Sequence, residues 1–147
     1  MATGNAASGK ASDGGVPASE LGVIRHFDAV EWVDEAKFGR VSADVVGEAK
    51  KAGARRKFLN RGDEGLYVQY STMPAGFRVA PHSHSHGEVL YILRGGCTVE
   101  PTGEQLSADD SAVIPGGHEY GFTCGPDGME FLTIRPGDAQ TSFTASA

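Results

Sequence analysis

From about residue 66, short stretches of apolar residues alternate with polar ones and are separated by Gly, Pro or Asp. Side chains that alternate along an extended backbone point to opposite faces, so one face of each strand can be buried. The pattern predicts strands over residues 66–73, 77–80, 88–93, 97–100, 111–114, 118–123 and 129–134. Many short strands at this spacing predict an all-β fold, either a barrel or a sandwich.

The first third of the chain has a different pattern. Residues 1–19 are rich in Ala, Ser and Gly and have almost no large apolar side chain, so burial cannot offset the entropy lost on ordering. A first strand is expected from Leu21, and the apolar spacing allows a short helix over residues 42–52. We therefore predict a disordered tail over residues 1–19 and one domain over residues 20–147.

Five basic residues fall within eight positions just before the predicted strands: Lys50, Lys51, Arg55, Arg56 and Lys57. A run of like charge is usually a solvated face of the protein. Such a run could also attract an anionic substrate or partner, but we prefer the solvated face as the interpretation.

The chain of 147 residues is long enough for one hydrophobic core. Its 19 acidic and 13 basic residues give a net charge of −6, which argues against a general attraction to nucleic acid or to an anionic membrane. No apolar run is long enough to span a bilayer, and the first residues do not resemble a secretory signal. The two cysteines, Cys97 and Cys124, imply no disulfide framework, so a cytoplasmic location is expected.

Residues 76–95 carry most of the chemistry and read G-F-R-V-A-P-H-S-H-S-H-G-E-V-L-Y-I-L-R-G. In an extended strand His82 and His84 point the same way, and His86 and Glu88 follow at the same parity. Imidazole suits first-row transition ions, and two His with one carboxylate can leave positions open for substrate or oxygen. Open positions imply chemistry rather than a structural metal. The stretch is therefore interpreted as a metal site.

The same stretch resembles the first motif of the cupin superfamily, in which a glycine, a His-x-His pair, a glutamate and a second glycine follow at set spacing. The fixed positions are matched by Gly76, His82, His84, Glu88 and Gly95. The resemblance implies a small, jelly-roll-like antiparallel β-barrel with a core over about residues 60–135 and extra N-terminal strands. It also implies that His82, His84 and Glu88 bind one divalent transition metal ion per chain, with Fe ahead of Zn, Mn or Ni, and that the protein is a homodimer.

A second motif of the superfamily, centred on Pro-x-Gly-x-x-His, follows later in the chain. Pro115 and Gly117 match it, but Tyr120 stands where a fourth ligand, a His, is usual, and His118 lies two residues earlier. On a strand His118 and Tyr120 would share a face, so either could complete the metal site or transfer protons in catalysis. A bound cation would lower the pKa of a phenol from ~10, so Tyr120 is a candidate metal ligand as well as a catalytic residue.

The resemblance leaves three functions open. The first is an iron-dependent dioxygenase that uses His82, His84 and Glu88. The second is a non-oxidative isomerase, lyase or cyclase, in which the ion acts as a Lewis acid and Tyr120 or His118 moves a proton. The third is a protein that binds a small molecule without converting it. Because oxygen chemistry is frequent in the superfamily, the dioxygenase is expected first, with a small organic molecule as substrate.

Overall fold

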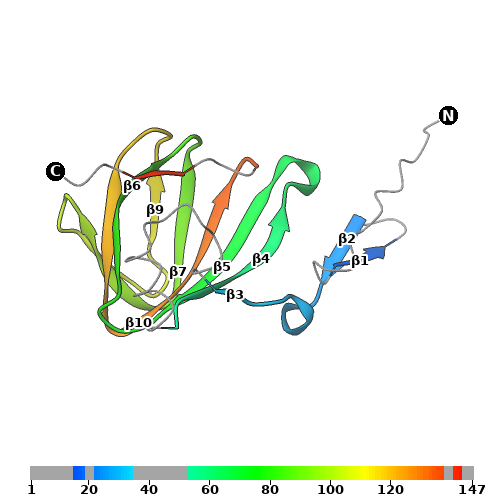
Figure 1. Ribbon diagram of the computed structural model, residues 1–147, viewed down its shortest axis with the longest axis horizontal. Coiled ribbons are helices and arrows are strands. Elements are labelled where there is room, and N and C mark those ends of the chain that lie inside the picture. Colours follow the sequence, from blue (N-terminus) through cyan, green and yellow to red (C-terminus); the bar gives the residue numbers. More distant parts are fainter. Residues whose placement is uncertain (1–14, 19–21, 35–52, 138–140, 144–147) are drawn as a thin grey trace. The chain divides into compact units, whose positions relative to one another are not determined.

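The computed structural model describes residues 15–18, 22–34, 53–137 and 141–143 (Figure 1). The chain divides into two compact units, residues 1–31 and residues 32–147. The single domain that we expected over residues 20–147 stays a prediction. The helix expected over residues 42–52 lies outside the described residues.

In the first unit, β1 (Gly15–Ala18) pairs antiparallel with β2 (Gly22–Arg25), and a short 3-10 helix, η2 (Phe27–Ala29), follows. The strand expected from Leu21 corresponds to β2. Strand β1 falls within residues 1–19, for which we expected disorder. Its backbone pairs with that of β2. Such pairing satisfies backbone N–H and C=O groups and does not depend on the burial of side chains. The rest of that segment lies outside the described residues.

The described residues of the second unit form an antiparallel sheet of nine strands. They are β3 (Val33–Asp34), β4 (Arg55–Arg61), β5 (Tyr67–Met73), β6 (Arg78–His84), β7 (Glu88–Glu100), β8 (Gln105–Ser107), β9 (Ser111–Ile114), β10 (Tyr120–Arg135) and β11 (Thr141–Phe143), with a 3-10 helix, η4 (Asp63–Gly65), between β4 and β5. The sheet curls on itself as a half-barrel, whose concave face is the interior (Figure 1). This arrangement confirms the predicted all-β antiparallel barrel. Among the described residues, no helix is long and apolar enough to cross a membrane.

Strand β10 is the centre of the sheet. Strand β7 runs antiparallel along one side of it, and β8 and β9 pair with β7 in turn. On the other side β10 pairs first with β6, where Tyr120 lies opposite His82, and then with β5, where Arg135 lies opposite Tyr67. Because β10 crosses from β6 to β5, side chains from both of these strands meet in the interior.

Strands β7 and β10 each join two strands that the sequence pattern predicted as separate. The pattern breaks at glycines, among them Gly95 and Gly128, and these residues have φ angles of +69° and +72°. Glycine adopts such angles without steric cost. A Cβ atom on Gly95 would lie 2.0 Å from the carbonyl oxygen of Gly128, so the two strands approach closely at this point. The glycines therefore bend the two strands rather than end them.

The interior is apolar in one half and polar in the other. The apolar half contains Leu90, Ile92, Cys97, Phe122, Cys124, Met129 and Phe131, and the Tyr120 ring packs in the same cluster. The polar half contains buried side chains that carry a polar group, namely Tyr67, Gln69, Ser71, His82, Glu88, Tyr120, Thr133 and Arg135. Burial of a polar group is unfavourable unless the group is hydrogen-bonded. The polar half is therefore the place in which to look for a functional site.

Candidate functional site

His82 and His84 come from β6, which continues four residues beyond the strand expected over residues 77–80. Two residues apart on a strand, they lie on the same face, and their ring centroids are 4.8 Å apart. Nδ1 of His82 lies 2.8 Å from the carbonyl oxygen of Ala80, to which it donates. This bond leaves Nε2 of His82 as an acceptor or a metal ligand.

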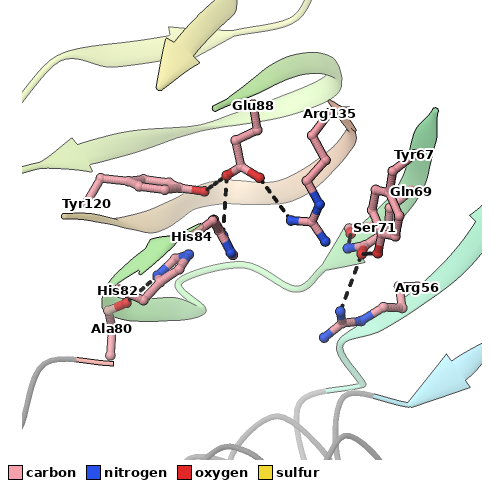
Figure 2. A network of polar contacts seen from close by, with 10 residues as sticks. All are labelled: Arg56, Tyr67, Gln69, Ser71, Ala80, His82, His84, Glu88, Tyr120 and Arg135. Carbon is pink, nitrogen blue, oxygen red and sulfur yellow. Dashed lines mark hydrogen bonds and ion pairs between the residues drawn. The ribbon is translucent and has the colours of Figure 1, made fainter. Parts of the chain in front are cut away.

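Glu88, the first residue of β7, is 3% exposed and joins the contacts of the polar half (Figure 2). Its Oε1 accepts a hydrogen bond from the Tyr120 hydroxyl and lies 3.4 Å from Nε2 of His84. Its Oε2 accepts a hydrogen bond from Nη1 of Arg135 at 3.2 Å. Both oxygens of this buried carboxylate are therefore engaged.

The Tyr120 hydroxyl is a proton donor in this arrangement. Burial first, and then the adjacent Glu88 carboxylate, raise the pKa of Tyr120 well above the ordinary value of a phenol. The side chain therefore keeps its proton near neutral pH and donates it in a hydrogen bond to Glu88. This protonated hydroxyl is the form that a proton-transfer role for Tyr120 requires, and its role as a metal ligand stays a prediction.

Both imidazoles of the site are neutral near pH 7. Burial lowers the pKa of His82. Burial also lowers the pKa of His84, to about 4, and nearby side chains add to the effect. The contact between His84 and Glu88 is therefore one of a neutral ring with a carboxylate. A neutral imidazole has the lone pair that a metal ion requires.

Two neutral imidazoles and a carboxylate are groups that bind first-row transition ions in proteins. Two ligands of such an ion lie roughly 3 Å apart, because each is about 2 Å from it. The 3.4 Å between Nε2 of His84 and Oε1 of Glu88 is close to that spacing. Among the described residues, no three His, Cys, Asp or Glu side chains already stand as ligands of one ion. Tyr120 and Arg135 donate hydrogen bonds to the two oxygens of Glu88, so an ion bound at Glu88 would share these oxygens with them.

His118 lies outside the polar half. Strand β10 begins at Tyr120, two residues later than expected, and His118 is exposed in the preceding turn, where its N–H donates to Pro115 O at 3.2 Å. The turn includes Gly117 at a φ of +74°, so the regular alternation of a strand does not extend back to His118. The expectation that His118 and Tyr120 share the interior face is therefore wrong. His86 is also exposed, between β6 and β7.

Arg135 is a site residue that the sequence analysis did not single out. It is the last residue of β10 and is 8% exposed, with its Cζ 4.0 Å from the centroid of the Tyr67 ring. Its parity with Phe131 and Thr133, both buried, is the sequence signal that places it inward. An arginine at the end of a strand is more often exposed. Alternation along the strand alone would therefore not place Arg135 in the interior, and its neighbour Glu88 is needed to explain why it is buried.

The basic run is divided between the two faces of β4. Lys57 is 3% exposed on the outer face, with its Nζ 4.7 Å from the centroid of the Trp32 ring, and Arg55 lies over the same ring at 4.2 Å. Arg56 is on the inner face, where its Nη1 donates to Oε1 of Gln69 at 3.3 Å. The solvated face that we expected is therefore wrong for Arg56 and Lys57, because a strand sends successive residues to opposite faces. The first two lysines of the run lie outside the described residues.

Cys97 and Cys124 lie opposite one another on β7 and β10, and both are free and buried. Burial raises the pKa of Cys97 to about 11 and that of Cys124 to about 12. Thiols that hold their protons are poor nucleophiles. Both cysteines belong to the apolar half, where each acts as a small buried apolar residue.

Comparison with known proteins identifies the part of the chain that carries the site. Residues 69–135 match the model of the Cupin domain family. This range includes the two imidazoles of the site, Glu88, Tyr120 and Arg135. A search of curated proteins finds no match to the chain.

Several solved structures resemble the chain in fold. KdgF from Halomonas sp. is 22% identical, the match covers 77% of this chain and 94% of that chain, and the TM-score is 0.58. The polyketide cyclase RemF from Streptomyces resistomycificus is 19% identical, with 64% and 72% covered and a TM-score of 0.56. An RmlC-like cupin from Shewanella frigidimarina is 27% identical, with 58% and 78% covered and a TM-score of 0.51. At such identities the likeness establishes the fold, and the reaction has to be inferred from the residues of the site.

Proposed function

Because this chain belongs to the cupin superfamily, we propose that it is a metal-dependent enzyme that acts on a small organic molecule. The observation that carries the proposal is the meeting of four side chains in the polar half: His82, His84, Glu88 and Tyr120. Neutral imidazoles beside a carboxylate are the donors that a transition ion requires. A protonated phenol beside them is a group that a purely structural metal site does not need.

His82, His84 and Glu88 would hold the ion, one per chain. When bound, the ion supplies a Lewis acid that polarises an oxygen of the substrate. The Tyr120 hydroxyl holds a proton that it can share with a negatively charged substrate oxygen in place of Glu88. Arg135 orients Glu88 through the bond from Nη1 to Oε2.

A non-oxidative reaction, such as an isomerisation, an elimination or a cyclisation, is the reaction type that these residues support best. The observation that favours it is the protonated Tyr120 beside Glu88, because a proton donor at the reacting atoms is useful in such reactions. The dioxygenase, which the sequence put first, stays a prediction that rests on the His/His/Glu set alone.

Oxygen consumption separates these reactions. We expect equal turnover in air and under anaerobic conditions, because a Lewis acid and a proton donor need no oxidant. Turnover that stops without oxygen, with oxygen consumed in proportion to product, would instead establish the dioxygenase. Tight ligand capture without any product would favour the third function, a binding protein.

Metal content tests the proposed ligands. Wild-type protein purified without oxygen should hold about one ion per chain, and elemental analysis would identify it as Fe, Zn, Mn or Ni. His82→Ala and His84→Ala should each lose most of the metal, because each variant lacks one imidazole ligand. His86→Ala is the matched control, since His86 is exposed, and it should keep the wild-type content. Equal metal content in all four proteins would rule out the ligand assignment.

The Tyr120→Phe variant tests the proton donor. Its kcat should fall about a hundredfold, the usual loss when one donor to a developing negative charge is removed, while its metal content stays unchanged. The substrate would be found by incubating the protein with a mixture of small organic molecules and following their depletion by mass spectrometry. Tyr91→Phe is the control, because the Tyr91 hydroxyl donates to Asp109 on the exposed surface at 3.0 Å. Loss of metal in Tyr120→Phe would indicate a phenolate ligand instead.

The homodimer and the cytoplasmic location both stay predictions. Light scattering of the full chain in solution tests the first. A mass of about one chain would contradict the dimer.

A further inference from the structure

The short strand β11 runs antiparallel along β6 at one end of the sheet, and it is the red strand beside β6 in Figure 1. The pairing places Phe143, its last residue, directly opposite His82. Residues that lie opposite one another on antiparallel strands carry their side chains on the same face of the sheet. Phe143 is therefore on the face of β6 that carries the two imidazoles of the candidate site.

Three aromatic rings form a row across β10, β6 and β11. His82 lies opposite Tyr120 in the pairing of β6 with β10, and opposite Phe143 in the pairing of β6 with β11. The centroid of the His82 ring is 4.7 Å from that of Tyr120 and 5.5 Å from that of Phe143. Because β6 lies between β10 and β11, the imidazole has one aromatic ring on each side.

The three rings differ in their exposure to solvent. Tyr120 is 6% exposed and His82 is 5% exposed, whereas Phe143 is 37% exposed. Phe143 is therefore the outermost ring of the row, and it covers the side of the His82 ring that faces the end of the sheet. The burial of His82 on this side depends on the phenylalanine ring.

This cover is held by few interactions. Strand β11 has three residues and pairs with β6 along one edge of the sheet, whereas β10 is paired with other strands on both of its sides. A short strand with few buried apolar contacts opens at a lower free-energy cost than the centre of a sheet. The contact between the rings of Phe143 and His82 favours the closed arrangement. Strand β11 can therefore separate from β6 while the rest of the sheet stays folded.

We propose that Phe143 is a further residue of the candidate site and controls the access of molecules to His82. With β11 in place, the ring excludes water from one side of the imidazole, and the exclusion of water strengthens polar interactions within a site. The inference adds to the proposed function, and its consequence for catalysis rests on that function. The contact of Phe143 with His82 does not depend on a metal ion.

The reactivity of His82 measures this cover. Diethyl pyrocarbonate transfers an ethoxycarbonyl group to the free nitrogen of a neutral imidazole, and Nε2 of His82 is free because Nδ1 donates to Ala80 O. The full chain is treated with a chelator and reacted near pH 7, and tandem mass spectrometry follows the modification of each His. His86 is exposed and is the internal reference. In the wild type, His82 should react at least about tenfold more slowly than His86, because it is reached when β11 opens.

Variants at Phe143 test its role. Phe143→Ala should raise the rate at His82 about tenfold and leave that at His86 unchanged, because the ring that holds the cover closed is lost. Phe143→Tyr keeps the ring and should react as the wild type does. Ile134→Ala is the matched control, since Ile134 is also 37% exposed but lies between two buried residues of β10 and so on its outer face. It should keep the wild-type rate at His82.

A wild-type rate at His82 in Phe143→Ala would overturn the inference, and so would equal rates at His82 and His86 in the wild type. If Phe143→Ala does not fold, Phe143→Leu takes its place, because the smaller side chain covers less of the imidazole. A wild-type rate at His82 in that variant would then overturn the inference.

The cover and the metal-dependent function fail in different ways, and elemental analysis of the same proteins before chelation separates them. An unchanged rate at His82 in Phe143→Ala, with wild-type metal content, would overturn the cover alone. A faster rate at His82 in Phe143→Ala, with no metal in the wild type, would overturn the metal-dependent function and leave the cover in place.

Discussion

Replacing Arg135 by Met should lower the free energy of unfolding by about 3–5 kcal/mol, the usual effect of removing one partner from a buried ion pair. Arg135 is 8% exposed, Glu88 is 3% exposed, and Nη1 of Arg135 donates to Oε2 of Glu88 at 3.2 Å. Without the guanidinium, the carboxylate keeps the hydrogen bond from Tyr120 but loses the cation that balances its charge. Urea unfolding of chelator-treated protein measures the effect, since chelation prevents a bound ion from compensating the charge of Glu88.

Two further variants test the reason for this loss. Arg94→Met is the matched control, because the Arg94 side chain is 81% exposed and its Nε lies 3.6 Å from Oε2 of Glu130. This variant should change the free energy of unfolding by less than about 0.5 kcal/mol. The double variant Glu88→Met/Arg135→Met removes both charges and should be more stable than Arg135→Met. Equal losses in Arg135→Met and Arg94→Met would contradict a buried ion pair that contributes to folding.

Replacing Gly95 by Ala should cost about 4 kcal/mol or more, or prevent folding. The new Cβ would lie 2.0 Å from the carbonyl oxygen of Gly128, and the φ of +69° is unfavourable for any residue with a Cβ. Relief would require the backbones of β7 and β10 to separate, although they pair on both sides of this point. Urea unfolding measures the cost, and circular dichroism shows whether the variant folds at all.

Gly103 separates the two causes of that cost. Its φ of +75° is similar, but nothing lies within 4 Å of an added Cβ. Gly103→Ala should therefore cost only about 1–2 kcal/mol, from the backbone conformation. Costs of equal size in Gly95→Ala and Gly103→Ala would mean that the close approach of the two strands contributes little to the requirement for glycine.

Alternation along the chain predicted the strands well where turn residues bound a short segment. The strand expected over residues 111–114 is β9, and that expected over residues 66–73 is β5 within one residue. Strand β4 was missed because its alternation is hidden in a run of basic residues, of which Arg56 faces inward and Lys57 is buried on the outer face. Charge was a poor guide there, since long basic side chains can bury their stems and still form polar contacts.

The candidate metal-binding side chains were easier to predict from the sequence than the residues that contact them. His82, His84 and Glu88 lie within seven residues, so strand parity and the motif were enough to single them out. Arg135 comes from the far end of another strand, 47 residues from Glu88 in the sequence, and no local pattern predicts their contact. The prediction for His118 was wrong for another reason. It assumed that the alternation of the strand continues from Tyr120 back to His118, but that segment is a turn.

Strand periodicity and motif spacing are short-range properties. They were sufficient to predict the all-β class and to single out the imidazoles and the carboxylate as candidate metal ligands. These properties did not predict the path of β10, which runs between β7 on one side and β6 and β5 on the other. That path places Tyr120 and Arg135 on the two oxygens of Glu88. Such contacts depend on the register of strands far apart in the chain, and register follows from the packing of the whole sheet rather than from any one segment.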